Sequence, residues 1–172
     1  MAPTASAKVE IAAPPTAVWA ILMDFERYPD WNPFIIKISG DQKVGSRPTV
    51  TLKPPNNSSG VTFSPVIQTM QLNKHIHWKG RLLGIPWLFT GHHHFILHPT
   101  ETGTKLEHFE NFSGILALIL HWIGSDVYET TERGFGLMND AIKERAERKP
   151  RSNPELTQRT KPSVKADSSF DT

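Results

Sequence analysis

Apolar and polar residues alternate along the stretch from Gly91 to Gly114, which is interrupted near its middle by Pro99 and Gly103. Alternation of this kind is typical of half-buried strands, and proline and glycine are typical of the turns between them. The pattern therefore predicts a β-hairpin over residues 91–114.

Pairing of Leu97 with Leu106 across the predicted turn fixes a register. His93 then lies opposite Glu110, with His108 one rung away. These ionisable side chains would share a face with apolar residues, namely Phe95, Leu97, Leu106 and Phe112. The other face would carry a mixture that suits a partly wet exterior, namely His92, His94, Ile96, Glu107, Phe109 and Asn111. A slip of one residue would exchange the two faces.

Patterns elsewhere predict further strands and two kinds of helix. Strands are expected over residues 8–12, 35–39, 48–53, 61–72 and 75–82. A first helix is expected between Pro15 and Asp24, followed by a turn-rich connector over residues 26–33. A long helix is expected from Ser125 to about Arg148, because one stripe of it carries Val127, Thr131, Phe135, Met138 and Ile142, whereas charged residues crowd its final turns. Consecutive short strands with hairpin-length breaks favour a curved antiparallel sheet.

Composition limits the classes of function. The chain has 172 residues, no cysteine and a net charge of +2. From Lys149 onward there are five Lys or Arg against three Asp or Glu, so the tail supplies this charge. A neutral body argues against a nucleic-acid partner. We also expect no secretory signal and no stable membrane insertion, hence a cytoplasmic protein that is a monomer or a homodimer.

Three motifs resemble one protein family. The first is Pro15-x-x-Val18-Trp19-x-x-Leu22-x-Asp24-x-x-x-Tyr28-Pro29-x-Trp31-Asn32-Pro33. The second is Gly91-x-His93-x-Phe95, followed by Leu106-x-His108-x-Glu110-x-Phe112-Ser113-Gly114, and the third is Met138-Asn139 with Lys143. Together they resemble the START-like or Bet v 1-like superfamily, also called SRPBCC, and within it the polyketide cyclase/dehydrase branch.

The resemblance implies an α+β helix-grip fold. A curved antiparallel sheet of about six or seven strands would wrap around the long C-terminal helix, with two short helices after the first strand. An apolar cavity would lie between the sheet and the long helix. The domain would span residues 8–148, between a flexible N-terminus (1–7) and a disordered tail (149–172).

The implied ligand is an apolar small molecule, polyketide- or terpenoid-like. The chain could be a cofactor-free cyclase, dehydratase or isomerase, or a non-catalytic carrier of lipids or hydrophobic metabolites. For the enzyme, His93 and Glu110 would transfer protons and His108 would relay or orient. The expected ligand-binding residues are Trp31, Phe34, Trp78, Trp87, Phe95, Phe112, Trp122, Phe135, Met138 and Asn139. For the carrier, the polar groups would only orient cargo.

Two further features have competing interpretations. His75, His77, His92 and His94 could lie near one another on the outer face, but the sequence fixes no complete ligand set, so we expect a solvated polar face and no metal. The apolar run from Gly114 to Gly124 could be a mobile lid or a membrane-touching segment. A short buried helix that closes the end of the cavity is the favoured interpretation.

Overall fold

The computed structural model describes residues 3–55, 60–85 and 87–148. Its N-terminal elements are β1 (Thr4–Ile11), α1 (Pro15–Met23), η1 (Phe25–Arg27) and α2 (Tyr28–Trp31). Strands β2 (Ile35–Ser39), β3 (Thr49–Leu52), β4 (Val61–Phe63), β5 (Val66–Gln71) and β6 (His75–Arg81) follow. Then come η2 (Leu82–Gly84), β7 (Thr90–Thr100), β8 (Gly103–Ser113), α3 (Ile115–Trp122) and α4 (Val127–Glu147). The expected disordered tail lies outside the described residues.

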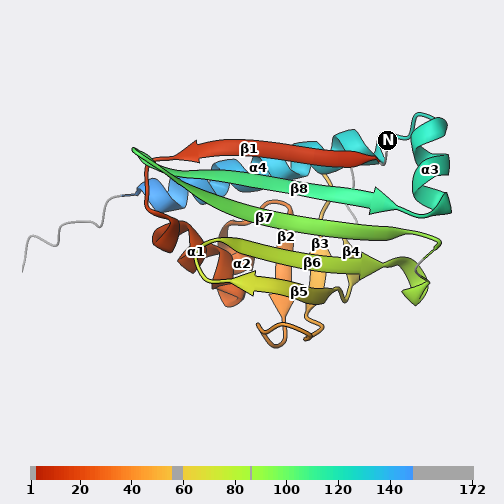
Figure 1. Ribbon diagram of the computed structural model, residues 1–172, viewed down its shortest axis with the longest axis horizontal. Coiled ribbons are helices and arrows are strands. Elements are labelled where there is room, and N and C mark those ends of the chain that lie inside the picture. Colours follow the sequence, from red (N-terminus) through yellow and green to blue (C-terminus); the bar gives the residue numbers. More distant parts are fainter. Residues whose placement is uncertain (1–2, 56–59, 86, 149–172) are drawn as a thin grey trace, which may run out of the picture.

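The strands form two antiparallel sheets. The larger has five strands in the order β1-β8-β7-β6-β5, and the smaller has three in the order β2-β3-β4. Figure 1 shows α4 running along one face of the larger sheet, where it packs against β1 and β8. This arrangement confirms the predicted α+β helix-grip fold.

The hairpin has the register that the hydrophobic pattern predicts. His93 pairs with Glu110, Phe95 with His108, and Leu97 with Leu106. The apolar members of this face are buried, which opposes a slip of one residue because a slip would expose them.

Two strand predictions were wrong. β1 begins at Thr4, not at residue 8, so residues 4–7, which we expected to be flexible, pair with residues 108–111 of β8. The predicted strand 61–72 is split into β4 and β5, which belong to different sheets. The break falls at Pro65, which has no backbone N–H for a strand ladder. The strand total therefore rises to five plus three, above the six or seven expected.

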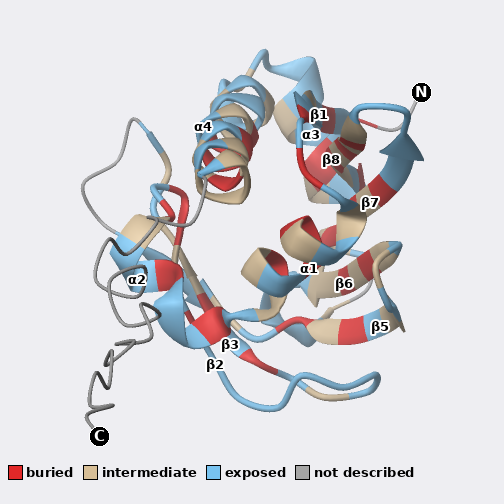
Figure 2. Ribbon diagram, turned by 90° about the vertical axis from the view of Figure 1, so that its left-hand side faces the viewer, coloured by how far each residue is buried: buried red, intermediate tan, exposed pale blue. Residues whose placement is uncertain are grey.

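Side chains of α4 fill the space beneath the larger sheet. Figure 2 shows the buried side of α4 turned toward the strands, and Phe135, Met138 and Ile142 on this side have no exposed surface. Two hollows among the described residues, of about 280 and 170 Å³, lie elsewhere. The first is lined partly by Arg47 and Lys79 and the second partly by Trp31. Neither of them is the internal apolar cavity expected between the sheet and α4.

The apolar run after β8 forms α3, but it is not a buried helix. Ala117 is the residue of α3 that is buried, whereas Ile115, Leu118, Ile119 and Trp122 are exposed. Figure 1 shows α3 projecting at one end of the larger sheet. Among the described residues, no helix combines the length and apolar character needed to cross a bilayer.

Candidate functional site

A chain of polar side chains crosses from the sheet to α4. Glu110 Oε2 lies 3.3 Å from His93 Nδ1, and His93 Nε2 lies 2.9 Å from His108 Nε2. His108 Nδ1 lies 3.0 Å from Asn139 Oδ1 on α4. We call Glu110, His93, His108 and Asn139 the inner relay.

The secondary structure places each member of the inner relay. His93 and Glu110 are direct cross-strand partners on β7 and β8, so their side chains share a face. The Phe135 ring stacks on the His108 ring, with centroids 3.8 Å apart and an interplanar angle of 24°. Asn139 follows Phe135 by one helical turn, on the same side of α4, and so reaches the edge of the same imidazole.

The relay determines where protons lie. Asn139 Oδ1 accepts, so His108 Nδ1 donates, and Nε2 of the neutral His108 ring is an acceptor. His93 Nε2 must then donate to His108. His93 Nδ1 faces Glu110 Oε2, a contact across which an imidazole and a carboxyl group can exchange a proton. Such a proton can be given to a third group.

Burial is graded along the relay. His108 is fully buried, and burial, followed by the charge of His93, holds the pKa of its imidazole well below the ordinary value of 6.5. The side chain of Glu110 retains 19% of its exposure and that of His93 11%. The Glu110 end is therefore the end that a solute can reach.

Aromatic rings form the walls around the histidines. The Trp78 ring stacks on His93, with centroids 5.5 Å apart and an interplanar angle of 15°. Phe95 contacts both histidines, with centroids 4.8 Å from His93 and 4.3 Å from His108. Phe34 packs edge-on against Phe135 at 5.6 Å. The fully buried Met138 lies beside Asn139 in α4.

Other predicted ligand-binding residues contact groups outside the inner relay. Trp31 is on α2, beneath the guanidinium of Arg145. Phe112 is buried against Phe89 and Tyr128 toward the α3 end of the sheet. Trp87 and Trp122 are 65% and 91% exposed, so neither is a wall of the inner relay in this structure.

Sequence reasoning missed three features of this region. Gly91 leaves the space that the Glu110 carboxylate fills, since a Cβ there would overlap Glu110 Oε1. A glycine inside a strand pattern is the available signal for such a close approach. Trp78 Nε1 and Asn139 Nδ2 are buried donors with no hydrogen-bond partner among the described residues. No sequence signal marks an unpartnered donor, because partners are set by packing.

Comparison with known proteins identifies the class. Residues 2–147 match the family described as polyketide cyclase / dehydrase and lipid transport. The chain belongs to this family, and it is thus a small-molecule-binding domain of the SRPBCC type. A search of curated proteins finds none that matches the sequence.

Solved structures share the fold at low sequence identity. Protein MLL2253 from Mesorhizobium loti is 19% identical with a TM-score of 0.62, over 83% of this chain and 95% of that one. Protein NE0264 from Nitrosomonas europaea is 20% identical with a TM-score of 0.62, over 83% and 93%. The di-domain ARO/CYC protein StfQ from the steffimycin biosynthetic pathway is 14% identical with a TM-score of 0.60, over 84% and 50%. At these identities the similarity shows the fold alone.

Proposed function

We propose that this protein binds an apolar, polyketide- or terpenoid-like molecule against the inner relay and catalyses a cofactor-free cyclisation, dehydration or isomerisation. The observation that carries the proposal is the contact between His93 Nδ1 and Glu110 Oε2, 3.3 Å apart on an otherwise aromatic wall. Family membership and the described biosynthetic role of StfQ favour the same substrate class.

The proposed chemistry needs one proton donor and one acceptor. In a dehydration, the carboxylate of Glu110 takes a proton from the carbon next to a ketone, and a new C=C bond forms as the neighbouring C–O bond breaks. The departing hydroxide takes a proton from the His93 imidazolium, and water leaves. Positioned acid–base groups of this kind contribute about 10²–10⁴-fold in rate. Substrate folding against Trp78 and Phe95 supplies the orientation.

Two buried donors support oxygen recognition. An unpartnered buried donor costs about 1–3 kcal/mol, and a ligand carbonyl or hydroxyl would remove that cost. Trp78 Nε1 and Asn139 Nδ2 are such donors on the two sides of the histidines. They suit a ligand that is mainly apolar and carries a few oxygens.

Ligand admission to the inner part of the relay requires movement, because His108 is fully buried. Glu110 lies three residues before the end of β8, and α3 follows that end directly. Helix α3, which lies at this end of the sheet (Figure 1), carries exposed apolar side chains. We infer that α3 moves to admit the ligand between itself and Phe112.

The test follows the dehydration of an aryl β-hydroxy ketone by the ultraviolet absorbance of the enone product. The full chain should accelerate the reaction, and His93→Asn should lose the acceleration. His98→Asn, on the outer face of the same strand, is the matched control. If His93→Asn turned the probe over as fast as the parent protein, the proton-transfer proposal would be wrong.

The second candidate is a carrier that uses the same site for cargo. The family description includes lipid transport, and the exposed apolar surface of α3 suits lipid transfer. Native mass spectrometry of the purified chain separates the two functions. A retained fatty acid, sterol or prenyl lipid, together with no turnover of the ketone probe, would favour the carrier.

A further inference from the structure

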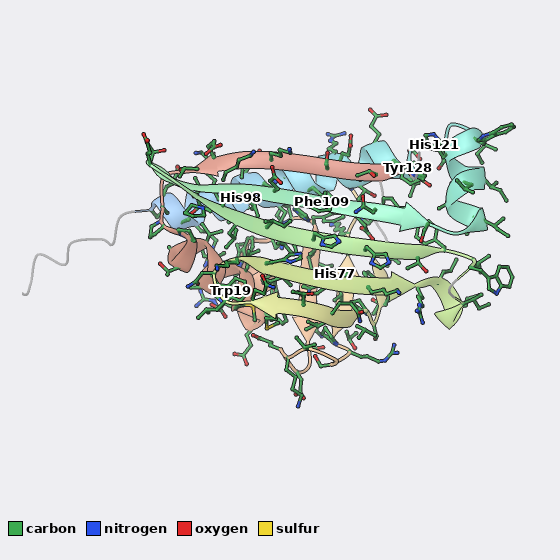
Figure 3. All side chains as sticks on the ribbon, in the orientation of Figure 1. Trp19, His77, His98, Phe109, His121 and Tyr128 are labelled. Atoms are coloured by element: carbon green, nitrogen blue, oxygen red, sulfur yellow. The ribbon has the colours of Figure 1, made fainter. Side chains whose placement is uncertain are left out.

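Four histidines gather on the face of the larger sheet that points away from α4. His75 and His77 lie on β6, and His92 and His94 lie on β7. In Figure 3, His77 on β6 and Phe109 on β8 lie over the strands on this side. The inner relay occupies the opposite face, because side chains alternate along each strand.

The four imidazoles approach one another closely. His77 pairs with His94 across the strands, as the hydrophobic pattern predicts. His77 Nε2 lies 3.0 Å from His92 Nδ1, and His75 Nε2 lies 3.0 Å from His94 Nδ1. One nitrogen from each of His77, His92 and His94 lies within 4.8 Å of the other two. His92 is the third ligand that the sequence alone could not place.

From this geometry we propose that His77, His92 and His94 bind a divalent transition-metal ion, zinc in the first instance. Imidazole nitrogens bind Zn²⁺ at about 2.0–2.1 Å, which places ligands of a tetrahedral ion roughly 3.3 Å apart. The 3.0 Å separation in the His77–His92 pair is close to that value. Small side-chain rotations of half-exposed rings would bring the third nitrogen into range.

The donor set determines the class of metal. Three imidazole nitrogens suit zinc, copper, nickel or cobalt, whereas calcium and magnesium require oxygen ligands. A three-histidine site leaves a fourth position for water or an anion. Lys79 pairs with His92, and Arg81 follows on the same strand, so the positive charges beside the cluster favour an anion at that position.

Neighbouring side chains orient the His94 ring. His75 hydrogen-bonds to His94, and Phe109 stacks on the His94 ring at 4.6 Å. Outer partners of this kind orient metal-binding histidines.

The proposal does not depend on the proposed function, because the two sites lie on opposite faces of the sheet and the test measures metal binding, not turnover. The untagged full chain is treated with EDTA, dialysed and titrated with ZnCl₂ in a calorimeter. We expect one Zn²⁺ per chain and an increase in Tm. Co²⁺ should give the visible absorption bands of a tetrahedral nitrogen-bound ion.

Variants decide whether the cluster is responsible. The double variant His77→Asn/His94→Asn should lose binding, and His75→Asn should weaken it by about 10–100-fold, as loss of an outer partner does. His98→Asn, on the same strand and face, should bind like the parent. His92→Asn gives an independent result should the double variant fail to fold. No saturable zinc binding by the parent, or undiminished binding by folded His92→Asn, would overturn the proposal.

Discussion

Both faces of the larger sheet carry clustered histidines, but the neighbours of these histidines differ between the two faces. On the inner face, His93 and His108 are buried among aromatic rings and linked to a carboxylate and an amide. On the outer face, His75, His77, His92 and His94 are half-exposed, and ring nitrogens of His75 and His77 lie 3.0 Å from those of His94 and His92. The partner therefore determines the chemistry, because a carboxylate beside an imidazole shares a proton, whereas neighbouring imidazoles offer lone pairs to a metal ion.

The largest expected effect contrasts two glutamates of β8. Glu110→Gln removes the carboxylate that contacts His93 and should lower kcat for the β-hydroxy ketone by about 10²–10⁴-fold. Glu107→Gln, on the outer face, removes contacts with Lys8 and Lys105 and should leave kcat unchanged. Initial rates at saturating probe measure both. Equal kcat values for the two variants would contradict the proposal that only the inner face takes part in proton transfer.

Truncation of an aromatic ring should also separate the faces. Phe135 is fully buried against His108, so Phe135→Ala should lower the free energy of unfolding by about 3–5 kcal/mol. Phe109, stacked on the outer-face His94, is half-buried, and Phe109→Ala should cost about 1 kcal/mol. Urea denaturation measures both values. A Phe109 effect as large as that of Phe135 would mean that the outer face is also a packed core.

Loss of the Asn139 amide should lower the free energy of unfolding, because one buried hydrogen bond is lost. Asn139→Ala leaves His108 Nδ1–H buried without its acceptor and should cost about 1–3 kcal/mol in unfolding free energy. In the outer cluster, His75→Ala should change stability by less than about 0.5 kcal/mol in metal-free buffer, since the ring is half-exposed. Similar losses for the two variants would contradict the difference in burial.

Acid should destabilise the protein through His108. Its ring faces His93 and Asn139, with Glu110 beyond, and burial keeps its pKa well below 6.5 in the folded state. The unfolded chain gains a proton near pH 6.5 that the folded chain does not, so stability falls as the pH drops below that value. The slope from this residue is at most about 1.4 kcal/mol per pH unit.

Replacement of His108 should remove that share of the slope. The free energy of unfolding of His108→Gln, measured between about pH 5 and pH 7.5, should fall less steeply with acid than that of the parent. The outer histidines, whose pKa values are also lowered, keep part of the slope in both proteins. Parallel pH profiles would show that His108 is not held neutral by the fold.

Local pattern was sufficient to predict the hairpin and the inner pair. Alternation around Pro99 and Gly103 fixes the register, and the register places His93 opposite Glu110. The start of β1 was missed because Ala5 and Ala7 give a weak apolar signal, and their pairing with β8 spans most of the chain. The direction of α3 was also missed, since it depends on Gly114 (φ 102°) and on backbone hydrogen bonds to Trp87 and Leu88.

The sequence predicted which residues form the inner relay, but it did not predict how the residues around the relay pack. Phe135 and Asn139 both contact His108. The sequence predicts the helix stripe and the hairpin face that bring these side chains together. Side-chain packing determines the exposure of Trp122 and the approach of His92 to His77. Sequence periodicity carries no information on those distances.

The most direct test of the central claim is a long-range ¹H–¹⁵N spectrum of the histidine rings in the full chain. A hydroxylated anthraquinone serves as a stable aromatic polyketide probe, and ZnCl₂ is added to a separate sample. We expect the anthraquinone to shift the ring signals of His93 and His108 and to leave those of His77 and His94 in place, and we expect zinc to do the reverse. An anthraquinone that left both inner histidines unchanged while shifting the outer ones would contradict the proposed division of the two faces.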